Sequence, residues 1–155
     1  MTADRLYFAQ HGIAVSKTED PERPLSNPGI MQTNSVAKQL HQSGEPVTDI
    51  FHSNKLRAQQ TAEIFSSILQ QTRTSVIDYL SPNDDIALIK PQLTSNNALY
   101  IGHLPHLGKL VSSLTAGDEE LDIIKFHNSA VVCLEKNVMR YQILWYLTPQ
   151  IILRS

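Results

Sequence analysis

The sequence predicts an α/β fold in three layers, a mostly parallel sheet with helices on both faces. Short apolar runs typical of buried strands alternate with longer amphipathic segments typical of helices. Turn-forming Gly, Pro, Asn and Asp residues separate these segments, and the chain contains no internal repeat or low-complexity linker. With 155 residues, the chain is long enough to bury a real core. We therefore expect a single domain over 1–155.

The chain begins with a predicted strand and helix. Residues 6–9 form a short apolar, aromatic run that is typical of a buried strand. Ser26 can cap a helix over 28–42, since Pro28 is favoured in a first turn. The expected apolar face of this helix comprises Ile30, Val36, Ala37 and Leu40.

A second strand and helix follow in the same order. Residues 47–51 predict a strand, and Ser53 or Asn54 is expected to cap a helix over 55–71. The side chains expected to face inward are Leu56, Ala62, Phe65 and Leu69.

The second half of the chain continues the alternation. Residues 81–85 predict a turn that opens a short helix, and a longer helix is expected over 106–114, ending at Gly117. Further strands are predicted over 75–78, 98–102, 130–134 and 141–146.

Charge and composition limit the classes of partner. The net charge of −2 argues against a nucleic-acid or anionic-membrane partner, because either would favour a basic excess. The single cysteine, Cys133, excludes an intrachain disulfide and lies in an apolar run typical of a buried thiol. No segment has the pattern of a signal peptide or a membrane span, so a cytoplasmic location is expected. Nothing in the sequence indicates an oligomeric state.

Polar residues follow three of the predicted strands. His11 follows the first, Ser53 and Arg57 follow the second, and His103 follows the strand that ends at Gly102. In open α/β sheets, ligands bind beyond the carboxyl ends of the strands. We therefore expect these side chains to converge on one site.

These residue types suit phosphoryl transfer without a metal. A neutral imidazole such as that of His11 can attack phosphorus, while arginines, a second histidine and backbone N–H groups carry the anionic charge. Gly12 fits a turn where the backbone approaches a ligand. Arg57 is expected in the first turn of a helix, where the helix dipole also favours an anion.

Several segments resemble the motifs of the histidine phosphatase superfamily, also called phosphoglycerate mutase-like. Residues 6–14 resemble its Arg-His-Gly segment, 53–62 its second phosphate segment, and 102–107 its second-histidine segment. The segment Arg23 to Ser26, with Gly29, resembles the region after the first motif. Residues 145–149 and the small size are similar to the SixA phosphohistidine phosphatase branch. The resemblance covers nearly the whole chain and implies the phosphoglycerate mutase-like fold.

The resemblance also implies an activity. It implies a phosphatase that removes phosphate from a phosphorylated protein, of the phosphohistidine type, or from a small phosphorylated substrate, through a phospho-His11 intermediate. His103 and Arg57 would act with His11, while phosphate would be bound by Gln10, Gly12, Arg23 and Ser53. No cofactor is implied.

One residue departs from the family pattern. The arginine before the nucleophilic histidine is Gln10 here, and the glutamate often found two residues after that histidine is Ile13. Glutamine offers neutral donors, whereas arginine offers a charged fork that binds phosphate bidentately. A second hypothesis is therefore a catalytically weak or inactive module that binds phosphate or phosphoprotein. A mutase is disfavoured, because the chain lacks the long insertions with which mutases of this superfamily enclose their substrates.

Two further assignments remain open at this stage. Asp84 and Asp85 could supply a general acid, but an exposed helix cap is the competing interpretation. The remaining histidines show no metal-ligand spacing; His103 and His106 lie three apart, but no further ligand completes a set. No metal site is predicted.

Overall fold

The structure, a computed structural model, describes residues 2–70 and 73–152. Its centre is a six-stranded mixed sheet in the order β3-β2-β4-β1-β5-β6. The strands are β1 (Arg5–Gln10), β2 (Asp49–His52), β3 (Arg73–Val76), β4 (Ala98–Gly102), β5 (Val131–Lys136) and β6 (Tyr141–Leu147). Strands β1 to β4 run parallel to one another, whereas β5 pairs antiparallel with both β1 and β6. The prediction of a mostly parallel sheet is confirmed.

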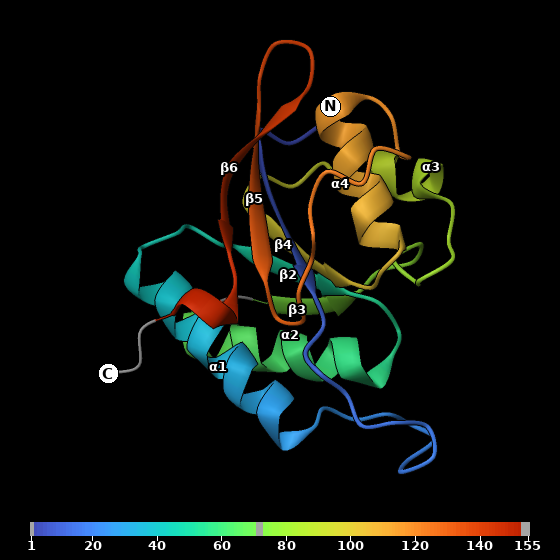
Figure 1. Ribbon diagram of the computed structural model, residues 1–155. Helices are drawn as coiled ribbons and strands as arrows, with labels where there is room; N and C mark the ends of the chain where they lie inside the picture. The colour runs from blue at the N-terminus through green and yellow to red at the C-terminus, as the bar shows by residue number, and fades with distance from the viewer. Residues whose placement is uncertain (1, 71–72, 153–155) are drawn as a thin grey trace.

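Helices cover both faces of this sheet (Figure 1). Helices α1 (Asn27–Gln42) and α2 (Leu56–Leu69) pack on one face. Helices α3 (Ile86–Ile89) and α4 (His106–Ala116) pack on the other. Short 3-10 turns cover Lys90–Gln92 and Pro149–Ile151. The three-layer α/β prediction is therefore confirmed.

The two faces of the sheet have separate cores because side chains alternate along each strand. In β1, Tyr7 and Ala9 join the core under α1 and α2, while Leu6 and Phe8 join the core under α3 and α4. Strand β4, at the middle of the sheet, is buried at every position. The ends of β1 and β4 are thereby held rigidly side by side.

Some predicted details differ. Ile30 was expected to face inward but is 40 % exposed, whereas the other three residues predicted for the inner face of α1 are buried. The second strand begins two residues later than expected, at Asp49. Helix α2 begins after Lys55 without a side-chain cap, so neither Ser53 nor Asn54 caps it. The predicted last residue of that helix, Gln71, lies outside the described residues.

Other expectations agree closely with the structure. Ser26 caps α1 by accepting the Gly29 N–H, and the fourth strand covers the predicted residues 98–102. Gly117 ends α4 in the left-handed conformation, with φ of 79°. Cys133 is buried, and burial raises the pKa of its thiol to about 12. Within the described ranges, the helices are too short or too polar to span a bilayer.

Candidate active site

Three neighbouring strand ends bring the predicted residues together. Strands β2, β4 and β1 are adjacent in the sheet, and Ser53, His103 and His11 directly follow them. The His11 N–H donates to the Gly102 carbonyl at 3.1 Å, so the chain leaves β1 beside the end of β4. The rings of His11 and His103 lie with centroids 4.9 Å apart. Segments 92 residues apart in sequence therefore share one site.

His11 is held as a neutral imidazole of defined tautomer. Its Nδ1 lies 2.7 Å from the carbonyl oxygen of Gly12, which can only accept, so the ring proton is on Nδ1. The Nε2 lone pair is therefore free. Burial, reinforced by the positive charges of Arg57 and Arg23, lowers the pKa of His11 to about 4 against the opposing effect of the Gly12 bond. At neutral pH this side chain has the form that a nucleophile needs.

His103 is buried against Ser53. Its Nε2 lies 2.6 Å from Ser53 Oγ, which also accepts the Lys55 N–H at 3.3 Å. Because that N–H fills one acceptor position, the hydroxyl proton can be donated to Nε2, which leaves the ring proton on Nδ1. His103 Nδ1 is buried without a partner among the described residues. Burial and the neighbouring His11 lower the pKa of His103 to about 3.

Two guanidinium groups approach this histidine pair without a carboxylate partner. Arg57 lies in the first turn of α2, and its buried Nε lacks a hydrogen-bond partner in the described part of the chain. Burial, and then the charge of Arg23, lower the pKa of Arg57. Among the described residues, the ion pairs involve Arg5 and neither of these arginines. Partly buried cations without a counterion favour the binding of an anion.

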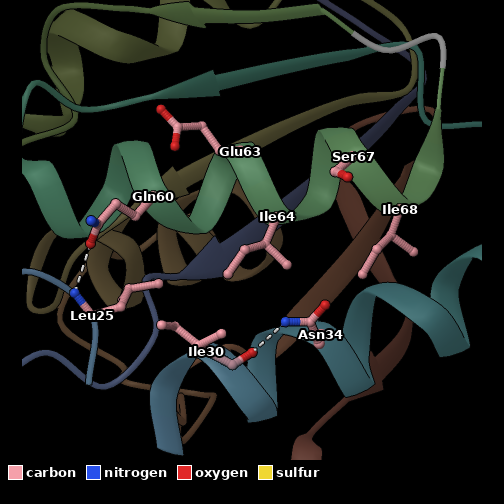
Figure 2. Close-up of a pocket in the computed structure, with 8 residues that line it drawn as sticks. All are labelled: Leu25, Ile30, Asn34, Gln60, Glu63, Ile64, Ser67 and Ile68. Atoms are coloured by element: carbon pink, nitrogen blue, oxygen red, sulfur yellow. Dashed lines mark hydrogen bonds between the residues drawn. The ribbon is translucent and has the colours of Figure 1, made fainter. Parts of the chain in front are cut away.

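Arg23 reaches the site from the loop between β1 and α1. Its backbone has a positive φ of 49°, and its Nε donates to the Val15 carbonyl at 3.0 Å. The loop is fastened to α2, because Gln60 Oε1 accepts the Leu25 N–H at 2.7 Å, a bond drawn in Figure 2. Arg23 is therefore held in a defined position near His11 and Arg57 by main-chain bonds of its own loop.

Gln10 ends β1 directly before His11. Its main-chain carbonyl accepts the Ser129 N–H at 3.0 Å. Its side-chain Oε1 is buried and has no hydrogen-bond partner among the described residues. A neutral side chain thus occupies the position at which the family motif has arginine.

Gly12 and Ser53, both predicted to bind phosphate, each make a contact within the site. The Gly12 N–H donates to Thr61 Oγ1 at 3.0 Å, so it is not free to bind an anion. A Cβ at Gly12 would lie 2.8 Å from Thr33 Oγ1, so close packing explains the glycine. The Ser53 hydroxyl lies beside His103. Both residues support the site by positioning its backbone and side chains.

The two candidate acids are engaged in the turn before α3. Asp85 is exposed and caps this helix by accepting the Ala87 N–H at 2.9 Å. Asp84 accepts the Ser81 N–H at 2.9 Å, and its charge partly offsets the burial that lowers the pKa of His106. The helix-cap interpretation is confirmed for Asp85.

Sequence reasoning missed three residues that hold the histidine loop. Thr61 accepts the Gly12 N–H, Asn128 Nδ2 donates to the His11 carbonyl at 3.0 Å, and the Ser129 N–H lies 3.3 Å from the same carbonyl. Asn128 and Ser129 lie in the loop before β5, far from the motifs in sequence. An Asn-Ser pair before a strand indicates a turn, and no sequence signal relates it to His11.

Figure 2 shows a separate hollow of about 330 Å³ between α1 and α2, lined in part by Ile30, Ile64 and Ile68. It lies on the outer side of these helices, and neither His11 nor His103 lines it.

Residues 2–70 and 73–152 contain no group of three His, Cys, Asp or Glu side chains that could hold a metal ion.

Comparison with known proteins agrees with this geometry. Residues 6–79 match the histidine phosphatase superfamily (branch 1). An uncharacterized protein of Picosynechococcus is 33% identical over 121 residues, which cover 72% of this chain and 73% of that protein. The phosphohistidine phosphatase SixA of Escherichia coli K12 is 28% identical over 122 residues, covering 74% of this chain and 76% of SixA.

Solved structures extend the similarity to nearly the whole chain. The protein histidine phosphatase SixA in complex with tungstate superposes with a TM-score of 0.82 at 25% identity, covering 94% of this chain and 97% of that one. A phosphoserine phosphatase mutant from Entamoeba histolytica, at 14% identity, shares the fold with a TM-score of 0.71, covering 99% and 100%. The chain belongs to the histidine phosphatase superfamily, and its similarity to SixA proteins supports a place in the SixA branch.

Proposed function

We propose that the protein is a metal-independent phosphatase that removes phosphate from phosphohistidine in a protein substrate. The observation that carries this proposal is the neutral His11, whose free Nε2 lies among two unpaired guanidinium groups and His103. Arg57 and Arg23 would bind the phosphoryl oxygens, and His103 Nδ1–H would donate to one of them. Such groups stabilise the charge that spreads over these oxygens in the transition state.

The reaction takes two displacements at phosphorus. First, His11 Nε2 attacks, a bond from Nε2 to phosphorus forms, and the bond to the substrate nitrogen breaks with its electron pair on that nitrogen. The substrate ring carries a proton on its other nitrogen, so it departs as a neutral imidazole. Water then attacks the phosphorus of phospho-His11, which releases inorganic phosphate and restores neutral His11. Each displacement leaves the same cationic groups around the phosphoryl oxygens.

A histidine leaving group suits the acid residues available. When the other ring nitrogen of phosphohistidine carries a proton, the leaving group is a neutral imidazole. The pKa of its imidazolium form is about 6.5, far below that of an alcohol, so its departure needs little help from a general acid. Asp85 is committed to a helix cap and Asp84 to the Ser81 N–H. The names of two relatives, phosphohistidine phosphatase SixA and protein histidine phosphatase SixA, support the same substrate class.

Gln10 favours a second candidate function, a module that binds phosphorylated protein without turning it over. A neutral amide at this position gives weaker hydrogen bonds to phosphoryl oxygens than a guanidinium and adds no charge. The cradle of Arg23, Arg57 and His103 would remain able to hold the anion.

Incubation of the purified protein with a ³²P-phosphohistidine protein separates the two functions. A phosphatase releases phosphate and carries acid-labile label on His11 during turnover, and His11→Ala abolishes both. Addition of a chelator leaves the rate unchanged. Tight binding of the phosphoprotein without release of phosphate or label on the enzyme would instead establish the binding module. Retained activity in His11→Ala would contradict the phospho-His11 pathway.

A further inference from the structure

The peptide group that joins His11 to Gly12 is bonded at both of its ends. Its oxygen accepts from Asn128 Nδ2 at 3.0 Å and lies 3.3 Å from the Ser129 main-chain nitrogen, which donates to it. Its N–H donates to Thr61 Oγ1 at 3.0 Å. The loop before β5 therefore binds the carbonyl of this peptide, and helix α2 binds its N–H.

The orientation of this peptide bears on the imidazole of His11. The carbonyl that accepts the Nδ1 proton belongs to Gly12, the residue with the freest backbone torsions. An unheld glycine would let this carbonyl turn away, and the ring proton could then move to Nε2, the atom required as nucleophile. A fixed peptide before Gly12 limits that freedom, because it fixes one side of the glycine.

We propose that Asn128 is a positioning residue that keeps His11 in the Nδ1-protonated tautomer. Its carboxamide holds the His11–Gly12 peptide so that the Gly12 carbonyl stays on Nδ1 and the lone pair stays on Nε2. This inference rests on the proposed function, in which Nε2 attacks phosphorus. It assigns to the loop before β5 a part in the chemistry that none of the phosphate-binding segments supplies.

Of the residues that hold this peptide, Asn128 can be substituted with the least disturbance to other contacts. Thr61 donates to the Arg57 carbonyl at 2.7 Å as well, so its replacement would disturb the phosphate cradle. Ser129 acts through its main chain and bonds Thr33 through its buried hydroxyl. Asn128 is half-buried, and the hydrogen bond to His11 is the side-chain contact the structure gives it.

Two variants remove this donor in different ways. Asn128→Asp keeps the size but cannot donate, while Asn128→Ala removes the donor without adding a charge. The matched control is Asn34→Ala on α1, which also deletes a bond from Nδ2 to a main-chain carbonyl, that of Ile30 at 2.9 Å (Figure 2). Asn34 lies on the outer side of the molecule and takes no part in the site.

The decisive measurement is the tautomer of His11 by two-bond ¹H–¹⁵N correlation on ¹⁵N-histidine-labelled protein. We expect the Nδ1–H form in the wild type and in Asn34→Ala, and a mixture containing the Nε2–H form in both Asn128 variants. In phosphatase assays, kcat should fall by about 10- to 100-fold, as for other groups that orient a functional histidine. KM should change less than about threefold, because the arginines remain in place.

The outcomes separate this inference from the proposed function. A folded Asn128 variant with the wild-type tautomer and wild-type kcat would overturn the positioning role. A shifted tautomer in the Asn128 variants, together with no phosphatase activity even in the wild type, would support the role of Asn128 and refute the proposed function. Either variant that folds is sufficient, since the tautomer is read without any substrate.

Discussion

At the scale of single residues, the site is governed by where charge is present and where it is missing. His11 and His103 are neutral because burial lowers the pKa of each, to about 4 and about 3. Arg23 and Arg57 supply positive charge without a carboxylate partner among the described residues. Gln10, between the first strand and His11, supplies none. Each of these features can be changed by one substitution.

Gln10→Arg should raise phosphatase turnover by about 10- to 1000-fold, the range over which placed charge stabilisers act in other enzymes. A guanidinium at this position would stabilise the charge on the phosphoryl oxygens in the transition state. Steady-state kinetics on a phosphohistidine protein provide the measurement, with Gln39→Arg on the exposed side of α1 as a control for added charge. A folded, phosphate-binding Gln10→Arg that stays inert would indicate that more than this arginine is missing.

Arg57→Ala should weaken phosphate or vanadate binding more than Lys55→Ala does. Arg57 has a buried, unpartnered Nε in the first turn of α2, whereas Lys55 is exposed one residue before the helix. Isothermal titration of both variants with vanadate gives the comparison. Equal losses would show that the site attracts anions through its total charge rather than through a placed guanidinium.

At the scale of elements, the contact between α1 and the His11 loop depends on one glycine. A Cβ at Gly29 would lie 2.1 Å from the carbonyl oxygen of Ile13, which is main chain and cannot easily move. Ser26 at the cap of α1 bonds the same carbonyl through its N–H and its hydroxyl, both at 2.9 Å. Helix α1 and the loop are therefore in direct backbone contact.

Gly29→Ala should destabilise the fold by at least about 1–3 kcal/mol, the usual cost of forcing extra atoms into a packed region. Gly108→Ala is the matched control, because a Cβ there meets its nearest neighbour at an ordinary 3.8 Å and alanine favours a helix. Urea unfolding of both variants tests the difference. A Gly29→Ala protein as stable as the wild type would mean that the loop can move away from α1 at little cost.

The elements that could be predicted from the sequence are those with strong local signals. Apolar runs located β1 and β4, and Ser26 and Gly117 marked the ends of helices. The start of α2 was predicted to within one residue, but its capping residue was not, because Ser53 contacts His103, 50 residues away, in place of capping the helix. The bond from Asn128 to His11 spans 117 residues and depends on the antiparallel pairing of β5 with β1.

The part of the site that could be predicted from the sequence is likewise the part marked by local motifs. Parallel strand ends account for the meeting of His11 and His103, which motif order and the sheet rule together anticipate. The glycine at position 12 was predicted to let the backbone approach a ligand. In the structure, a side chain at position 12 would collide with Thr33 of α1. Contacts of this kind follow from packing of distant segments and leave no local pattern.

At the scale of the whole molecule, the buried histidines couple folding to pH. Unfolded histidine has a pKa of about 6.5, above the values of about 4 and about 3 for His11 and His103 in the fold. Below pH 6.5 the unfolded chain therefore binds more protons than the folded one. The free energy of unfolding should fall as the pH is lowered from about 6.5 toward 3.

Urea titrations between pH 7 and pH 4.5 measure this slope. His11→Gln should flatten it, because one depressed site is removed, while His41→Gln on the exposed side of α1 should leave it unchanged. Identical slopes in the wild type and His11→Gln would contradict the burial of His11 as a neutral group. Phosphate at saturating concentration should raise the stability at every pH, since it binds the folded state.

Neutral Gln10 also affects how quickly the product leaves. Inorganic phosphate meets the same groups as the transferred phosphoryl, so any charge that speeds bond breaking also delays release of the product. A site with glutamine before His11 lets phosphate go more readily than a site with arginine there. Gln10→Arg should therefore lower the inhibition constant for phosphate while it raises kcat. In the proposed reaction, Gln10 would make the enzyme slower per encounter but would let it keep its activity where free phosphate is abundant.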